Sequence, residues 1–251
     1  MQDVLRDACA VFWKERRELL TARRWRPFSA HILLLVTLFG VVIPYSQGPY
    51  WVSESYPLAF HFLFVPLIAT LPYVADTFAG ERERKTIEPL LATRISERGI
   101  FLGKCWAVWL VAYLQVLAVV FTGWIVLNVY NYLELGSRSF FFYSAPASVL
   151  LLLGSASTVA LSTGLGVLVS LRSETVRGAQ QASGMLLLGL SLPVLFGISH
   201  LAEPYGGFGW RAALGFTAGV GLAAYMALRV GIAAFRRERL ILGRTRWKKS
   251  P

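Results

Sequence analysis

The chain has 251 residues, of which 55% are hydrophobic and only 16% are charged, and its mean hydropathy is +0.54. This composition excludes an ordinary soluble domain and makes the lipid bilayer the solvent of most of the chain. The formal net charge of +11 does not indicate nucleic-acid binding, because the lysines and arginines lie in short clusters between long apolar runs, as membrane topology requires.

Residues 1–27 are predicted to form an amphipathic helix on the inner surface of the membrane. Plotted at 100° per residue, one face is apolar and the opposite face is charged. The apolar face is imperfect, because Arg16 lies inside it while Val4 and Val11 lie off it. A solvated basic arm that only enforces topology is the alternative. The apolar face consists of Leu5, Ala8, Cys9, Phe12, Trp13, Leu19 and Leu20.

Six apolar stretches are long enough to cross a hydrocarbon layer about 30 Å thick, which requires roughly 20 residues in a helix. Helices are expected because a lipid-exposed backbone must satisfy its own hydrogen bonds. Pro193 and Gly197 suggest that the fifth helix breaks near its outer end. The stretches are Phe28 to Tyr45, Pro57 to Ala75, Cys105 to Leu127, Pro146 to Leu171, Gln180 to His200, and Trp210 to Phe235.

The distribution of basic residues sets the expected orientation. All lysines and arginines except Arg138, Arg211 and Arg229 fall on one side of the six spans, which places both termini in the cytoplasm by the positive-inside rule. The expected fold is therefore an all-α integral membrane protein. A connecting helix (1–27) precedes a six-helix domain (28–235) with a cytoplasmic loop at 76–104, and a basic cytoplasmic tail follows (236–251).

The loop between the second and third spans carries more information than topology requires. Three glutamates accompany its basic residues between Ala75 and Leu91. Gly80 predicts a break, and Thr86 as a cap with Pro89 in the first turn predicts a short helix. Such an element can dock on a soluble partner through charged pairs that surround apolar anchors.

This loop resembles that of the type-2 (ABC-2 type) exporter permeases, which reads approximately F-x-x-E-R-x-x-G-T-L-E-x-L-L and then, after a short spacer, G-K. The sequence departs from that pattern at Lys85, where the family usually has glycine, and at Arg94-Ile95, where a proline often sits. The six-helix order and the amphipathic helix also fit, although only the loop is specific. The matching residues are Phe78, Glu81, Arg82, Thr86, Ile87, Glu88, Leu90, Leu91, Gly103 and Lys104.

The resemblance implies that this loop is a coupling helix in a groove of a separate ATPase, and that the amphipathic helix connects the same ATPase to the membrane domain. The implied partners are two cytoplasmic ABC ATPase subunits, a second permease copy or a paralogue, and membrane lipids, in the inner or plasma membrane. ATP and magnesium are expected on the ATPase and no cofactor on this chain. The implied ATPase-binding residues are Phe78, Gly80, Glu81, Arg82, Glu83, Thr86, Ile87, Glu88, Leu90 and Leu91.

Small residues recur every four positions along the sixth span and predict a ridge for close helix packing. This ridge can pack against another helix of the same monomer or form a seam between two copies, and the sequence leaves both alternatives open. The row is Gly215, Gly219, Ala223, Ala227 and Gly231.

Neutral polar residues inside the spans are candidates either for a substrate pathway or for interhelical hydrogen bonds. These residues are Gln115, Thr122 and Ser191.

The predicted function is the permease subunit of an ATP-driven exporter that moves a substrate outward from the cytoplasm or the inner leaflet. A membrane scaffold that transmits force to an extracytoplasmic partner is an alternative from another class, and a membrane-embedded enzyme is a second. No intrinsic catalytic site is predicted, because no nucleophile, base and orienting group can be assembled from the sequence. No metal site is predicted, because His31, His61 and His200 are scattered.

Overall fold

The computed structural model describes residues 2–20, 30–48, 55–86, 94–134, 136, 140–202 and 209–235, with side chains at all of these except 2, 20, 55–60, 195 and 197–202. Within these segments every regular element is a helix, which confirms the all-helical prediction. The elements are α1 (Gln2–Leu20), η1 (Val36–Val42), α3 (Ile43–Gln47), α5 (Ser55–Glu83), α7 (Glu97–Leu133), α8 (Ala145–Val149), η2 (Leu150–Gly154), α9 (Ser155–Ser170), α10 (Val176–Ala202) and α11 (Trp210–Ala234).

Five helical stretches among the described residues are long and apolar enough to cross a membrane. The predicted fifth span corresponds to α10, which includes side chains outside the described set. Six spans and two cytoplasmic termini therefore stay predictions. The five stretches are Ala30–Gln47, His61–Glu83, Glu97–Leu133, Ala145–Ser170 and Trp210–Ala234.

Two spans extend well beyond their predicted limits, so the predicted 76–104 loop is shorter than expected. Helix α5 continues to Glu83, and α7 already begins at Glu97. At 1.5 Å per residue, the 37 residues of α7 measure about 55 Å and exceed the hydrocarbon thickness. Hydropathy marks only the part of a helix that lies in lipid, whereas backbone hydrogen bonding continues past it. The predicted break at Gly80 is wrong, because Gly80 lies inside α5.

Helix α5 ends in a Schellman motif. The Thr86 N–H donates to the Glu81 carbonyl at 2.9 Å, and the Lys85 N–H donates to the Arg82 carbonyl at 3.1 Å. Lys85 has a φ of 57°, a left-handed conformation that glycine adopts at little cost. Lys85 stands where the family pattern usually has glycine, and its backbone conformation is one that favours glycine. The short helix predicted after Thr86 falls on residues 87–93, outside the described residues.

Helix α10 is continuous from Val176 to Ala202 with Pro193 inside it, so the predicted break in this helix is wrong. Proline removes one backbone hydrogen bond. Membrane helices tolerate this loss, because neighbouring groups and small local adjustments satisfy the freed carbonyl.

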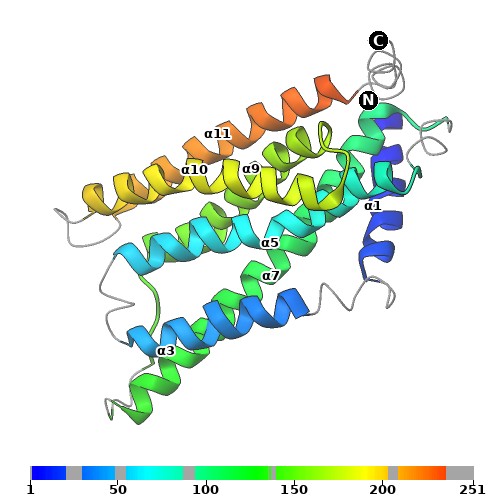
Figure 1. Cartoon of the computed structure of the whole chain (residues 1–251). Helices are drawn as coiled ribbons and strands as arrows, with labels where there is room; N and C mark the ends of the chain where they lie inside the picture. The colour runs from blue at the N-terminus through cyan, green and yellow to red at the C-terminus, as the bar shows by residue number, and fades with distance from the viewer. Residues whose placement is uncertain are drawn as a thin grey trace.

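The helices of the bundle run roughly along one direction, and α1 lies across one end of it, where α5 and α11 end and α7 begins (Figure 1). Helix α7 contacts α1, η1, α3, α5 and α9. Close approach of α1 to α7 depends on Gly103, because a Cβ there would lie 2.5 Å from the Ala8 carbonyl oxygen. We call this end of the bundle the α1 end.

The row of small residues on α11 divides into two parts. Ala227 is buried, and a Cβ at Gly164 of α9 would lie 2.9 Å from its methyl group. A Cβ at Gly215 or Gly219 would meet nothing within 4 Å, and Ala223 is exposed. Residues four apart drift about 40° around a 3.6-residue helix, so the row turns from the monomer's interior to its surface.

Candidate functional site

Helix α1 presents a face to the bundle that differs from the predicted apolar face. Ala8, Val11, Glu15 and Leu19 are buried and recur every three or four residues. Val11 was predicted to lie off the apolar face, and Glu15 was not singled out. The signal for Glu15 was its position, four residues after Val11 and four before Leu19, where a charged side chain on an apolar face requires a buried partner.

That partner is Lys104 of α7. Its Nζ lies 2.9 Å from Glu15 Oε1 and 2.6 Å from Glu81 Oε1 of α5. The side chains of Glu15 and Lys104 are each 1% exposed, and that of Glu81 is 7% exposed. We call Glu15, Glu81 and Lys104 the ionic triad. It joins three helices, and none of the three charges could lie there alone, because an isolated buried charge is costly.

The triad holds two carboxylates around one ammonium group. Burial raises the pKa of Glu15. The positive charges of Lys104 and then Lys14 lower it by more than burial raises it, so the pKa lies below the ordinary value for glutamate. Lys14 lies on the solvent side, with its Nζ 3.3 Å from Glu15 Oε1. The second oxygen of Glu81, Oε2, is buried without a hydrogen-bond partner among the described residues.

A second contact joins α1 to the start of α7. Asp7 Oδ2 accepts a hydrogen bond from the Ser96 backbone N–H at 2.9 Å, and the Ser96 hydroxyl oxygen caps α7 by accepting from the Gly99 N–H at 3.2 Å. The hydrogen bonds from the backbone and then the side chain of Ser96 hold the pKa of Asp7 below its ordinary value. A Cβ at Gly99 would lie 2.5 Å from Asp7 Cβ, so α1 reaches this cap only because residue 99 is glycine.

The end of α5 is tied to the connection between α9 and α10. Arg82 donates a hydrogen bond to the Leu171 carbonyl, and Glu83 Oε2 accepts one from the Val176 N–H at 2.9 Å. The last turn of α5 is therefore held on one side by the triad and on the other by this connection.

The implied ATPase-binding residues occupy different environments. The polar contacts described for Glu81, Arg82 and Glu83 are made within the chain, so contact with an ATPase stays a prediction for these residues. Phe78 packs edge-on against Phe235 with ring centroids 6.3 Å apart, inside the core. Of the ten, Phe78, Gly80 and Glu81 are buried, Arg82 is half-buried, Glu83 and Thr86 are exposed, and Ile87, Glu88, Leu90 and Leu91 lie outside the described residues.

The three candidate pathway residues do not meet in one place. Gln115 of α7 is buried and donates its side-chain amide N–H to the hydroxyl of Tyr73 on α5. Thr122 lies two turns further along α7 and faces Gly40, where a Cβ would lie 3.1 Å from the threonine Cβ. Ser191 donates to a carbonyl of its own helix at 3.1 Å. Gln115 therefore makes an interhelical hydrogen bond, the alternative that the sequence left open, whereas Thr122 has only a steric contact between helices. A role in a substrate pathway stays a prediction for all three residues.

One family model matches most of the chain. The family described as "ABC-2 family transporter protein" matches residues 9–208, a range that begins within α1, contains the whole triad and ends after α10. Neither the curated proteins nor the solved structures contain a match to the chain.

Proposed function

Because the chain belongs to the ABC-2 family of transporter proteins, we propose that it is the membrane-spanning permease subunit of an ATP-driven exporter. It moves a substrate outward from the cytoplasm or the inner leaflet, and hydrolysis takes place on two separate ATPase subunits that hold ATP and magnesium. Both termini and the α1 end face the cytoplasm. The second half of the assembly is another copy of the chain or a paralogue.

The ionic triad is the observation that carries this proposal. Two of its residues come from the helices that flank the docking segment 87–93, Glu81 near the end of α5 and Lys104 near the start of α7. Lys104 holds Glu15 of α1 and Glu81 of α5 at hydrogen-bond distance in a buried site. These charges join the connecting helix to both helices that flank the docking segment. Separating them would be costly, because it would leave a buried charge without its partner.

The triad supports transmission of motion as one unit. An ATPase that displaces the docking segment pushes on α5 and α7 together, and the Asp7–Ser96 contact carries α1 with them. Packed interfaces respond to such a displacement by rigid-body rotation rather than by continuous deformation. In this scheme Glu81 and Lys104 are positioning residues, and the direct contacts to the ATPase come from the segment 87–93.

Affinity purification tests the proposal directly. The tagged chain is extracted from its native membrane in a mild detergent, and the recovered ATPase and its nucleotide hydrolysis are measured. The variant Ile87→Ser/Leu90→Ser removes two anchors of the docking segment. The control variant Val129→Ser/Leu133→Ser replaces two exposed aliphatic residues with serine at the other end of α7.

We expect ATPase to accompany the wild-type chain and the control variant in stoichiometric amounts, and to be lost from the docking variant while its elution profile is unchanged. Recovery of no ATPase with the wild-type chain would refute the exporter assignment. Full retention by the docking variant would refute the role of 87–93. Hydrolysis without substrate movement in reconstituted vesicles would instead favour the force-transmitting scaffold.

A further inference from the structure

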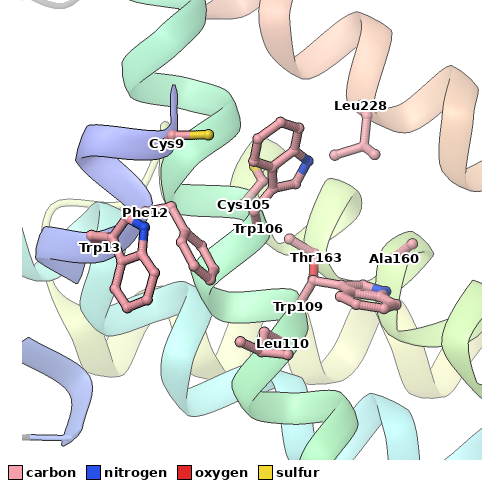
Figure 2. Close-up of a pocket in the computed structure, with 10 residues that line it drawn as sticks. All are labelled: Cys9, Phe12, Trp13, Cys105, Trp106, Trp109, Leu110, Ala160, Thr163 and Leu228. Atoms are coloured by element: carbon pink, nitrogen blue, oxygen red, sulfur yellow. The ribbon is translucent and has the colours of Figure 1, made fainter. Parts of the chain in front are cut away.

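An apolar groove of about 610 Å³ lies between α1, α7, α9 and α11 at the α1 end (Figure 2). Its wall is mostly apolar. The hydroxyl of Thr163 already donates to a carbonyl of its own helix at 2.8 Å, and the indole N–H of Trp109 donates to the Ala156 carbonyl at 3.0 Å. It opens outward, because Trp13 is 51% exposed and Trp106 is 38% exposed. The lining residues are Cys9, Phe12, Trp13, Cys105, Trp106, Trp109, Leu110, Ala160, Thr163 and Leu228.

The groove lies at the depth of one lipid leaflet. On α7 its residues follow directly after Lys104 of the triad. On α9, Thr163 comes seven residues before the end at Ser170, and on α11, Leu228 comes six residues before the end at Ala234. At 1.5 Å per residue these distances are about 10 Å, which is about one third of a hydrocarbon layer about 30 Å thick, measured from the α1 end.

Helix α1 turns a second apolar face toward this opening. Leu5, Cys9 and Trp13 are exposed and lie together on the helix, roughly 120° from the face that packs on the bundle. A helix at the end of the bundle with one face on protein, one apolar face outward and a third charged face has the form of an interfacial helix. Tryptophan at such a boundary is typical of the headgroup region.

Arg16 lies on this outward apolar face. Its guanidinium carbon is 4.4 Å from the centroid of the Trp13 ring, which lines the groove. Arg16 Nε is buried and has no hydrogen-bond partner among the described residues. A planar guanidinium group beside an apolar opening, with a donor left over, can pair its N–H groups with two oxygens of a tetrahedral phosphate group.

We propose that the groove binds one acyl chain of an anionic phospholipid and that the phosphate of the same lipid pairs with Arg16. The lipid belongs to the inner leaflet, and only this part of the proposal rests on the proposed function, which places the α1 end in the cytoplasm. The groove volume is within the 300 to 1,000 Å³ range of small-molecule sites. A peptide in extended form does not fit, because the wall offers almost no groups for its backbone N–H and C=O.

The lipid acts as a wedge between α1 and the spans. It covers the exposed indoles and completes the contacts of α1 on the side away from the triad. Because the triad and the lipid hold two different faces of one helix, loss of the lipid leaves α1 attached by its buried face alone. The bound lipid therefore fixes the orientation of the connecting helix toward the bilayer.

Native mass spectrometry of the full chain in detergent tests the proposal. Phosphatidylglycerol and phosphatidylcholine with identical acyl chains are titrated separately onto wild-type protein and variants. Arg16→Ala removes the guanidinium group, and Arg17→Ala makes the same charge change one residue away on a different face of α1. Ala160→Phe fills part of the groove. Arg16→Lys keeps the charge and loses the planar fork.

We expect the wild-type chain to bind phosphatidylglycerol roughly tenfold more tightly than phosphatidylcholine, from one charge-assisted contact. Arg16→Ala removes this preference, Arg16→Lys retains part of it, Arg17→Ala leaves it unchanged, and Ala160→Phe weakens both lipids.

Equal losses in the Arg16 and Arg17 variants would overturn the proposal in favour of diffuse attraction. Competition by inorganic phosphate alone would show that the acyl chain is not recognised, and a dimer that forms only when the groove is unfilled would assign it to a second copy. The binding assay contains no ATPase, so its failure is distinguishable from failure of the proposed function.

Discussion

Lys104 Nζ lies 2.6 Å from Glu81 Oε1, and this buried pair joins the helices on both sides of the segment that we propose docks on an ATPase. The same ammonium group is 2.9 Å from Glu15 Oε1 of α1. One lysine therefore determines the relative positions of three helices. The preceding residue, Gly103, allows α1 to approach closely enough for the second of these contacts. In the Gly-Lys pair, Gly103 thus has a steric role and Lys104 an electrostatic one.

Replacing Lys104 with methionine is expected to destabilise the chain by about 3–5 kcal/mol, because two buried carboxylates lose their counter-charge. The triple variant Lys104→Met/Glu15→Gln/Glu81→Gln recovers most of this loss, since no charge is left buried. Unfolding in a denaturing detergent measures both. Arg84→Met serves as the control, because its ion pair with Asp76 lies at the surface, where a pair contributes about 0–1 kcal/mol. A loss after Lys104→Met no larger than that of the control would show that the triad does not hold the helices together.

Replacing Lys85 with glycine is expected to stabilise the end of α5 by about 1 kcal/mol. Lys85 has a φ of 57°, where a side chain is unfavourable and glycine is not. Lys85→Ala removes the charge but keeps the Cβ, so it separates the backbone effect from electrostatics. A rise in the unfolding midpoint for glycine but not for alanine is the expected result. Equal midpoints for the two variants would mean that the charge, not the backbone, decides stability there.

The outward part of the small-residue row predicts a seam with a second copy. Gly219→Leu is expected to lower the dimer fraction in cross-linking and light scattering while the monomer keeps its unfolding midpoint, because a Cβ at Gly219 meets nothing within 4 Å. Gly164→Leu is the contrasting variant. A Cβ there would lie 2.9 Å from Ala227 Cβ, so we expect about 1–3 kcal/mol of overpacking inside the monomer. An unchanged dimer fraction in Gly219→Leu would place the seam elsewhere.

The docking of α1 is expected to weaken in acid. The pKa of Glu15 is held below its ordinary value of 4.5 in the folded chain. A carboxyl with a depressed pKa contributes stability above the unfolded value and loses it as the pH falls through the folded value. Asp7, with its pKa below 3.8, acts in the same direction at lower pH. Amide hydrogen exchange of α1, corrected for the intrinsic pH dependence of exchange, should therefore accelerate below pH 4.5.

Glu15→Gln is the control for this pH effect. The amide does not titrate, so the change in α1 exchange between pH 6 and the acid range should shrink to the part that Asp7 contributes. An equal acid response in the wild-type chain and in Glu15→Gln would assign the effect to other carboxyls.

Much of the architecture followed from the sequence, because lipid imposes simple rules on composition. The limits of the last span were predicted within one residue at each end, and the fourth span was equally close, since apolar length is the property that a bilayer selects. The motif around Glu81 and Arg82 indicated the family that the match over 9–208 shows. The extension of α5 to Glu83 was missed, because charged helical turns outside the hydrocarbon have the composition of a loop.

The sequence by itself determined that this chain is a helical membrane protein of the ABC-2 transporter family, because those properties depend on local composition and on one contiguous motif. Only the tertiary structure decided that Glu81 points inward to Lys104, and that Glu15, 89 residues away from that lysine, completes the triad. It also decided which of the small residues on α11 face outward. Such pairings depend on how three helices cross, and no periodicity within a single helix carries that information.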